Sequence, residues 1–217
     1  MRRHLAVSVA SVAVLIGSAW VAAQAPPAIQ LPAPQMEGGK PLMQALKLRA
    51  TSREFAPDPL PPQTLSNLLW AAWGINRPDS GKRTAPSAHD WQETGVYVVT
   101  ASGAFLYDAR NNRLMPVAAG DLRALAGVQA FVKEAPVTLV FVADTARMKG
   151  AAPDMQQSYA WADTAFLSQN VYLFCASSGL ATGVRAMVDR APLAKALKLA
   201  PTQLITLAQS VGYPKKQ

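Results

Sequence analysis

Two arginines and two hydroxyl residues lie within five positions early in the chain, in the order Arg49-Ala50-Thr51-Ser52-Arg53. A guanidinium is planar and stays charged, and hydroxyl groups add short hydrogen bonds, so the cluster suits a phosphate dianion. The simpler interpretation is that Arg49 and Arg53 are solvated charges at a frayed helix end. On this stretch alone the simpler interpretation is favoured, because short motifs often occur by chance. The rest of the chain changes that balance.

Two further segments have the composition of ligand-binding loops. Residues 76–90 are rich in turn formers and carry three cations, Arg77, Lys82 and Arg83. Loops on a rigid scaffold often carry function, although solubility alone would also explain the cations. The turn at 179–183 follows the longest helical pattern of the chain and contains two glycines. The arginine cluster, the loop from Arg83 to Gln92 and the turn at 179–183 are therefore three candidate ligand contacts.

The charge and the reactive residues exclude several classes of protein. The chain has 21 Lys and Arg against 13 Asp and Glu, a net charge of +8, which becomes +6 when the two arginines of residues 1–23 are removed. No basic run interleaved with aromatic residues indicates a nucleic-acid partner. His89 and Cys175 are the one histidine and the one cysteine left after residue 23. The mature chain is therefore not expected to form an internal disulfide or a Cys/His zinc site.

The first 23 residues have the pattern of a secretory signal peptide, with a basic start, an apolar run and small residues before a break. A retained membrane anchor is the alternative, since the apolar run is nearly long enough to span a bilayer. Arg2-Arg3 partly resembles a twin-arginine export signal. We expect a periplasmic or secreted protein without stable membrane insertion after cleavage. A Pro- and Ala-rich linker is expected at 24–39 and one domain at 40–217.

The apolar pattern that must position these segments mixes helices and strands. Helices are expected at 42–48, 62–74, 121–126, 155–178 and 192–199, and strands at 95–101, 104–107, 113–117, 135–143, 180–184 and 204–211. The run 135–143 is nearly continuously apolar, which indicates a strand buried on both faces. The helix at 155–178 is apolar over much of its circumference, so it is expected at the centre or at a subunit interface. The pattern predicts an α+β protein.

From about Pro41 to its end, the sequence resembles the flavin-dependent nitroreductase family. The family's opening motif, Arg-x-Ser-x-Arg-x-Phe, binds the FMN phosphate and matches residues 49–55, with Thr51 in place of the serine. A second motif, Pro-Ser-Ala-x-Asn-x-Gln, contacts the FMN of the other subunit and matches residues 86–92. Asp90 replaces its asparagine. An ionised Asp can only accept hydrogen bonds, so a contact with the ring would require a protonated Asp90 or would be lost.

Two more motifs of the family are present, each with one difference from the family pattern. The Gly-Leu-Gly-Thr turn, whose backbone lies against the flavin, corresponds to residues 179–182, with Ala181 at the second glycine. The closing Gly-Tyr strand, followed by basic residues that reach the phosphate, corresponds to Gly212-Tyr213 with Lys215 and Lys216. The arginine that usually follows is missing, which bears on the role of Lys215.

The resemblance implies a three-layer α+β sandwich with an antiparallel or mixed sheet, helices on both faces and a domain-swapped homodimer. It also implies an FMN-dependent oxidoreductase that passes hydride or electrons by a ping-pong mechanism from a donor, NAD(P)H or another, to a small organic acceptor. The cofactor supplies the reaction, so no catalytic side chain and no metal are required. The cofactor-binding residues implied are Arg49, Ala50, Thr51, Arg53, Pro86, Ser87, Ala88, Asp90, Gln92, Leu180, Ala181, Thr182 and Lys215.

Two other functions remain open from the sequence. Asp90 and Ala181 motivate a non-catalytic flavin- or anion-binding module that kept the fold. Ser87 and His89 would be the nucleophile and base of a hydrolase, but no third group orients the histidine. Nicotinamide donors are scarce outside the cytoplasm, and the segment 73–88 also resembles the azoline-oxidising dehydrogenases of the family. The donor could therefore be a small molecule, a quinone or a redox protein.

Overall fold

The computed structural model describes residues 27–216, which fold around one seven-stranded sheet. The strand order is β1-β6-β5-β4-β7-β9-β8, and each neighbouring pair is antiparallel. The strands are β1 (Ile29–Gln30), β4 (Thr94–Thr100), β5 (Gly103–Asp108), β6 (Arg113–Ala119), β7 (Val137–Asp144), β8 (Ala181–Arg185) and β9 (Gln203–Gly212). A separate ribbon of β2 (Ile75–Arg77) and β3 (Lys82–Arg83) lies in the loop expected at 76–90.

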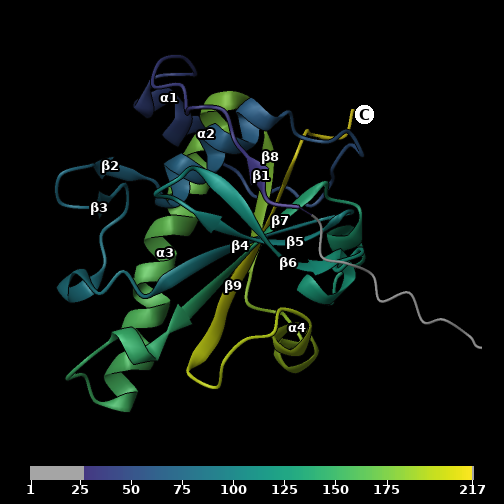
Figure 1. Cartoon of the computed structure of the whole chain (residues 1–217). Coiled ribbons are helices and arrows are strands. Elements are labelled where there is room, and N and C mark those ends of the chain that lie inside the picture. Colours follow the sequence, from purple (N-terminus) through teal and green to yellow (C-terminus); the bar gives the residue numbers. More distant parts are fainter. Residues whose placement is uncertain (1–26, 217) are drawn as a thin grey trace, which may run out of the picture.

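Helices cover both faces of the sheet (Figure 1). The α-helices are α1 (Leu42–Leu48), α2 (Pro62–Trp73), α3 (Pro153–Ser178) and α4 (Arg190–Ala196), and short 3-10 turns lie at Ala88–Asp90, Arg123–Ala126, Ala130–Lys133 and Thr145–Arg147. α2 and α3 pack on one face, whereas α4 and the turns between 123 and 133 pack on the other. The predicted three-layer α+β arrangement is confirmed, and the described pairings are antiparallel rather than mixed.

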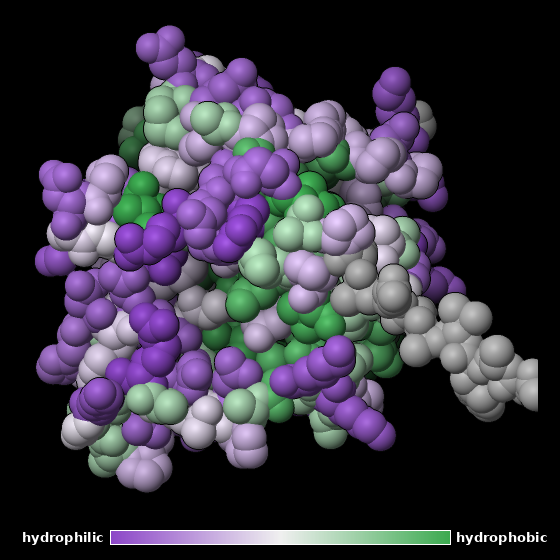
Figure 2. All heavy atoms as spheres, viewed as in Figure 1, coloured by the Kyte–Doolittle hydropathy of each residue, from purple (hydrophilic) through white to green (hydrophobic). Residues whose placement is uncertain are grey.

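The alternation of side chains along the central strands separates two apolar cores. In β4, Val96 and Val98 belong to the core under α2 and α3, while Tyr97 and Val99 belong to the core under α4. Successive strand residues point to opposite faces, so a strand covered on both sides must be apolar throughout. β7 is buried at every position but its last, which confirms the expectation for 135–143. On the face shown in Figure 2, hydrophobic atoms gather toward the middle and hydrophilic atoms surround them.

The long helix α3 has clear starting and ending signals. Pro153 occupies its first turn, where the fixed φ and missing N–H of proline cost nothing. Gly179 ends it with a φ of 73°, a left-handed conformation that glycine adopts without a steric penalty. Leu167 and Val171 are buried against the sheet, whereas Phe166 on the outer side is 48% exposed. The helix therefore contributes to the core and also leaves apolar surface uncovered.

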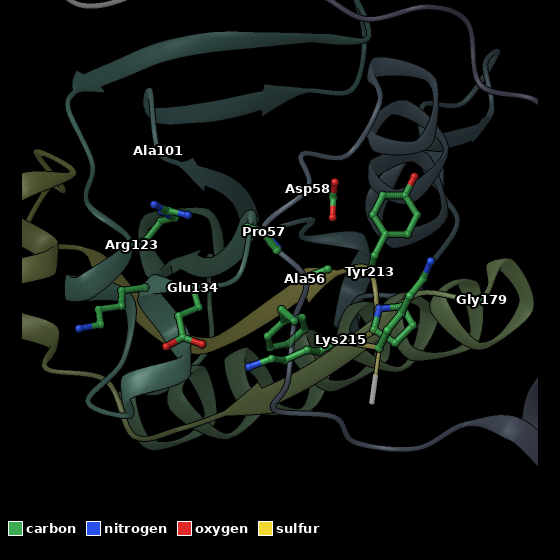
Figure 3. Close-up of a pocket in the computed structure, with 13 residues that line it drawn as sticks. Ala56, Pro57, Asp58, Ala101, Arg123, Glu134, Gly179, Tyr213 and Lys215 are labelled. Atoms are coloured by element: carbon green, nitrogen blue, oxygen red, sulfur yellow. The ribbon is translucent and has the colours of Figure 1, made fainter.

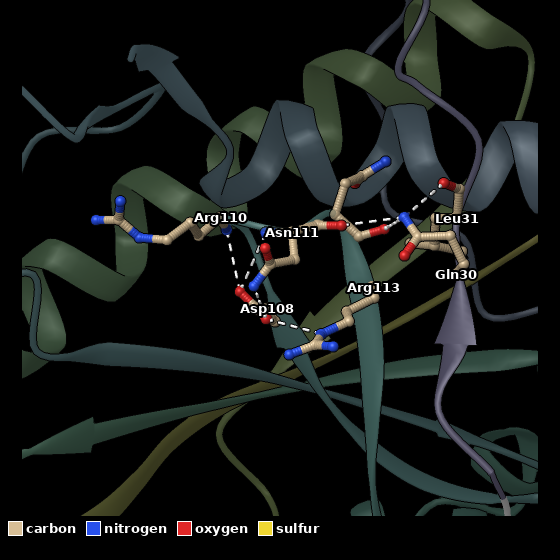
Figure 4. Close-up of polar contacts among 7 residues, drawn as sticks. Gln30, Leu31, Asp108, Arg110, Asn111 and Arg113 are labelled. Atoms are coloured by element: carbon tan, nitrogen blue, oxygen red, sulfur yellow. Dashed lines mark hydrogen bonds and ion pairs between the residues drawn. The ribbon is translucent and has the colours of Figure 1, made fainter. Parts of the chain in front are cut away.

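The first strand is fixed by the turn between β5 and β6 (Figure 4). Asp108 Oδ1 accepts the backbone N–H groups of Arg110 and Asn111 at 3.1 and 3.3 Å, which shapes the turn. Gln30 Nε2 donates to the Asn111 carbonyl at 3.0 Å. The turn between β5 and β6 thus also holds β1 at the edge of the sheet.

Residues 29–31 belong to the folded domain, which corrects the expected linker at 24–39. Ile29 pairs with Leu114 of β6, and Leu31 is 3% exposed within the core under α2. The strand is too short to give a periodic signal, and its Pro-rich neighbours concealed it. The predicted signal peptide at 1–23 lies outside the described residues. Between residues 27 and 216, no helix combines the length and apolar character needed to cross a bilayer.

Leu31→Ala tests whether the segment before residue 40 is part of the fold. Deleting a buried leucine side chain should lower the free energy of unfolding by about 2 to 5 kcal/mol. Val128→Ala is the matched control, because Val128 is 62% exposed and should change stability little. The measurement is urea unfolding followed by circular dichroism. Equal losses from the two variants would contradict the placement of Leu31.

Candidate functional site

The segment 49–55 lies along the outer edge of β8. The Ser52 N–H donates to the Thr182 carbonyl at 2.8 Å, and further on Ala56 N–H donates to the Tyr213 carbonyl at 2.9 Å. Gly183 permits this approach, because a Cβ at that position would lie 2.7 Å from the Ser52 carbonyl oxygen. The arginine cluster, the turn after α3 and the end of β9 are therefore brought together, as three of the four sequence motifs require.

A tyrosine of α3 fixes the start of this segment. The Tyr172 hydroxyl accepts the Val184 N–H at 3.1 Å and lies 2.8 Å from Thr51 Oγ1. Its own proton is free to bond to Thr51, since it accepts from Val184. The Arg49 guanidinium lies over the Tyr172 ring, with its carbon 5.3 Å from the ring centroid. One buried tyrosine thus sets the positions of both Arg49 and Thr51.

Arg49 and Arg53 are exposed and have no carboxylate partner among the described residues. The two ion pairs found between residues 27 and 216 are Arg113 with Asp108 and Arg123 with Asp121. Two guanidinium groups without a counter-ion among the described residues, in the same short segment as a fixed threonine hydroxyl, are the donors that a phosphate group requires. The residues present fit the phosphate of a nucleotide-like cofactor.

The residues of the turn at 180–182 are buried. Leu180 belongs to the main core, and Ala181 packs in a small cluster with Phe55 and Ala135. Thr182 Oγ1 donates to the Ser210 carbonyl at 2.8 Å and is 2% exposed. These three side chains make contacts in the protein interior, whereas the Thr182 carbonyl accepts the hydrogen bond that holds the 49–55 segment. The methyl group of Ala181 fills the core, so the replacement of glycine there does not obstruct the exposed arginines.

Lys215 lies at the far end of the 49–55 segment from Arg49. Phe55 forms a β-bridge with Pro214, and Lys215 borders a cavity of about 1140 Å³ (Figure 3). Arg123 and Glu134 also line this cavity, but Arg49 and Thr51 do not. The structure therefore places Lys215 beside residues 55–58 and not beside Arg49.

The loop at 86–92 is anchored to α3 at a different point. The Ala88 N–H donates to Asp163 Oδ2 at 2.9 Å, and Ser87 Oγ accepts the Gln92 N–H at 3.0 Å. Pro86 and Asp90 are exposed, while Ser87, Ala88 and Gln92 are partly buried. Asp90 Oδ1 accepts from Gln92 Nε2 at 3.1 Å. The Asp90 carboxylate, which replaces the asparagine of the motif, thus accepts a hydrogen bond from within the loop.

The loop at 86–92 and the arginine cluster are held at different points of α3. Asp163 holds the loop and Tyr172 holds the segment 49–55, and the two anchors are separated along α3 by roughly 13 Å, at 1.5 Å of rise per residue. The fourth motif faces another part of the surface.

A buried carboxyl pair lies directly behind the loop. Glu93 and Asp163 are 2% and 3% exposed. Burial raises the pKa of both groups, and the charge of Asp163 raises the pKa of Glu93 further. Neighbouring Arg83 donates from Nε to Gln92 Oε1 at 2.7 Å, and burial followed by the charge of Arg147 lowers the pKa of Arg83.

The other reactive residues have no arrangement that suits catalysis. The Cys175 thiol is fully buried, and burial raises its pKa. His89 stacks on Trp91 with 4.7 Å between ring centroids. The Ser87 hydroxyl is occupied by the loop backbone, so a nucleophile and base pair is not formed. Between residues 27 and 216 no cluster of three or more His, Cys, Asp or Glu could hold a metal ion.

Tyr172, Asp163 and Glu93 were missed by sequence reasoning. Tyr172 and Asp163 lie in an apolar helical pattern, where a tyrosine reads as core and a single acid reads as surface. A polar residue on the buried face of α3 was the one available signal for Asp163. Glu93 follows directly after the matched motif at 86–92, and nothing in its spacing distinguishes it.

Comparison with known proteins agrees with the geometry. The profile of the nitroreductase family matches residues 46–213. A crystal structure from Ralstonia eutropha JMP134, named as a "putative nitroreductase", is 40% identical, covers 88% of this chain and 90% of its own, and has a TM-score of 0.84. A Methanocaldococcus jannaschii protein of the same designation is 30% identical over 62% of this chain and 72% of its own.

A more distant structure has the same fold. The E. coli microcin synthetase McbBCD complex with truncated pro-MccB17 is 20% identical over 79% of this chain and 73% of the matched chain, with a TM-score of 0.67. At this level of identity the similarity concerns the fold alone.

Tyr172→Phe tests whether the tyrosine hydroxyl organises the site. The change leaves the ring under Arg49 but removes the partner of Val184 N–H and Thr51, which should cost about 1 to 3 kcal/mol of stability. Tyr159→Phe is the control, because its hydroxyl has no partner in the described structure and its loss should cost little. Urea unfolding compares the two variants. A Tyr172→Phe protein as stable as Tyr159→Phe would refute the assignment.

Proposed function

Because the chain belongs to the nitroreductase family, we propose that it is an FMN-dependent oxidoreductase. It transfers hydride or electrons by a ping-pong mechanism between a donor and a small organic acceptor. The observation that carries this proposal is the exposed pair Arg49 and Arg53, unpaired by any described carboxylate and set beside the fixed Thr51 hydroxyl. Such donors favour a phosphate dianion over a neutral ligand.

The protein's own residues bind and orient in this proposal. Arg49, Thr51 and Arg53 hold the phosphate, and Tyr172 keeps two of them in place through its ring and hydroxyl. The backbone of residues 180–182 supports the same segment through the Ser52 bond to Thr182. When bound, FMN supplies the redox chemistry. Lys215 has a supporting role at most, since it lies at the Phe55 end of the segment.

A homodimer would complete the site. The loop at 86–92 lies on a different part of α3 from Arg49, so it is suited to reach the cofactor of a second subunit. The outer side of α3 and the neighbouring α1 expose apolar residues that a partner would cover, which supports this arrangement. Among them are Met155, Phe166, Leu42, Met43 and Leu46.

The donor and the compartment belong to the same proposal. The pattern of residues 1–23 supports export to the periplasm or beyond. NAD(P)H is scarce there, so another small reductant, a quinone or a redox protein is an equal candidate for the donor. The acceptor is a small organic molecule.

Asp90 favours one alternative, a module that binds flavin or an anion without turnover. Its carboxylate stands where the family motif has an amide donor, and it accepts from Gln92 within the loop. Ala181 gives this alternative no support, because its side chain is in the core. Bound flavin that no biological donor reduces, whether NADH, a quinol or another class, would favour the module.

Arg49→Ala tests the phosphate assignment. The purified mature protein should be yellow, with the absorption bands of oxidised flavin that bleach on reduction. Loss of charge-assisted hydrogen bonds of about 1.5 to 3 kcal/mol should raise the Kd for FMN by about 10- to 100-fold in Arg49→Ala. Lys47→Ala is the control, because Lys47 is an exposed cation on the nearby helix α1 and should change the Kd little.

Titration of apoprotein with FMN, followed by flavin fluorescence, measures both constants. A wild-type protein that stays colourless and takes up no added FMN would overturn the proposed function. Equal losses in the two variants would leave FMN binding intact but refute the role of Arg49.

A further inference from the structure

Glu93 and Asp163 form a pair of buried acids outside the cofactor-binding residues. Glu93 stands just before β4, and Asp163 projects from α3. Glu93 Oε1 accepts from Thr94 Oγ1 at 3.2 Å, while Glu93 Oε2 is buried with no hydrogen-bond donor among the described residues. The two carboxyl groups are within hydrogen-bonding reach of each other. A buried oxygen without a hydrogen-bond donor lowers stability. The contact between the two carboxyl groups is therefore favourable only if one of them carries a proton.

The hydrogen bonds and charges around the two acids indicate which of them keeps that proton. Asp163 Oδ2 accepts the Ala88 N–H at 2.9 Å, a bond that favours the ionised form of Asp163. Glu93 accepts the Thr94 hydroxyl and its own backbone N–H, which both lower its pKa, but burial is the larger effect and, with the charge of Asp163, raises that pKa. Two close carboxylates in a buried place cannot both ionise readily. Glu93 therefore holds the proton and donates it to Asp163, which satisfies both acids.

The loop that depends on this pair is strained. His89, Asp90 and Gln92 have φ angles of 50°, 52° and 47°. The left-handed region is unfavourable for residues other than glycine and persists only where neighbouring contacts enforce it. The Ala88 bond to Asp163 is the hydrogen bond that ties this loop to α3, beside the ring contacts of His89 and Trp91 with Tyr159. Loss of that bond should release the loop.

We propose that one proton shared by Glu93 and Asp163 locks the 86–92 loop onto α3, and that Glu93 is a positioning residue for the subunit-bridging half of the cofactor site. The positioning role of Glu93 toward the cofactor site rests on the proposed FMN function, whereas the lock concerns the loop alone. Glu93 has no contact with substrate or cofactor in this role.

The lock has a defined pH dependence. The pKa of Glu93 is raised above its ordinary value by burial and by Asp163, so the unfolded or loop-released state binds fewer protons. Stability of the locked loop is complete below the ordinary glutamate pKa of about 4.3 and is lost as pH rises through the raised pKa. Other ionisable groups face the same region around a cavity of about 210 Å³: Arg83 from β3, Tyr97 from β4, Tyr107 from β5, Asp144 from β7 and Arg147 after it.

Trp91 reports on the loop directly. It lies inside the 86–92 segment and packs against His89 and Tyr159. Its fluorescence is isolated by subtracting the signal of the same protein with Trp91→Phe. Because the His89 ring packs against Trp91 and would contribute to its signal, the measurement uses a His89→Asn background, in which asparagine tolerates the left-handed conformation.

Glu93→Gln is the decisive variant. The amide stays neutral at every pH and can donate to Asp163, so the loop should remain locked and the alkaline transition of Trp91 should vanish. Glu134→Gln removes an exposed carboxyl and should leave the transition unchanged. If Glu93→Gln does not fold, Asp163→Asn serves instead. Its amide oxygen can accept the Ala88 N–H and its NH2 group can donate to ionised Glu93, so the loop should stay locked at high pH and the alkaline transition should vanish.

The FMN titration separates this inference from the proposed function. In the wild type, the Kd for FMN should rise by about tenfold per pH unit above the transition, as expected when one proton is required for the competent state. Glu93→Gln should abolish that rise. A Trp91 transition that persists unchanged in Glu93→Gln, or a wild type without one, overturns the lock. A normal transition in a protein that binds no FMN would uphold the lock and refute the proposed function.

Discussion

The covering of the β8 edge by residues 49–55 is the constraint on which the candidate site depends. An edge strand leaves backbone groups unpaired, and here the Ser52 bond to Thr182 satisfies one of them. The close approach is possible because Gly183 has no side chain. The same contact leaves Arg49, Thr51 and Arg53 at the surface. The segment that covers the free edge of β8 thus also exposes two arginines without a described counter-ion and a threonine hydroxyl group.

Helix α3 organises both halves of the proposed site. Tyr172 fixes the arginine segment, and Asp163 fixes the 86–92 loop. The helix keeps these anchors apart, so the proposed phosphate clamp and the 86–92 loop lie at separate points of α3. The apolar surface on its outer side, which includes Phe166, is suited to a second copy. Buried polar residues on a mainly apolar helix therefore link packing to function.

The sequence predicted the sheet and helices well because their periodic patterns are long. The continuous apolar run of β7 and the signals at Pro153 and Gly179 were read directly from residue types. β1 could not be predicted, since two residues carry no period and the pairing depends on a distant turn. The cofactor motifs indicated the candidate segments at 49–55 and 86–92, but not the residues that anchor them. Tyr172, Asp163 and Glu93 act through neighbours far apart in sequence, which residue spacing does not reveal.

The central claim is that each flavin site combines the arginine segment of one subunit with the 86–92 loop of another. Co-expression of an Arg49→Ala chain and a Ser87→Glu chain, carrying different tags and purified through both, isolates the mixed dimer. Each homodimer should bind FMN weakly, whereas the mixed dimer has one intact site of two and should hold about half the wild-type flavin content. A mixed dimer as poor in flavin as either homodimer, or a failure of the two chains to associate, would contradict the account.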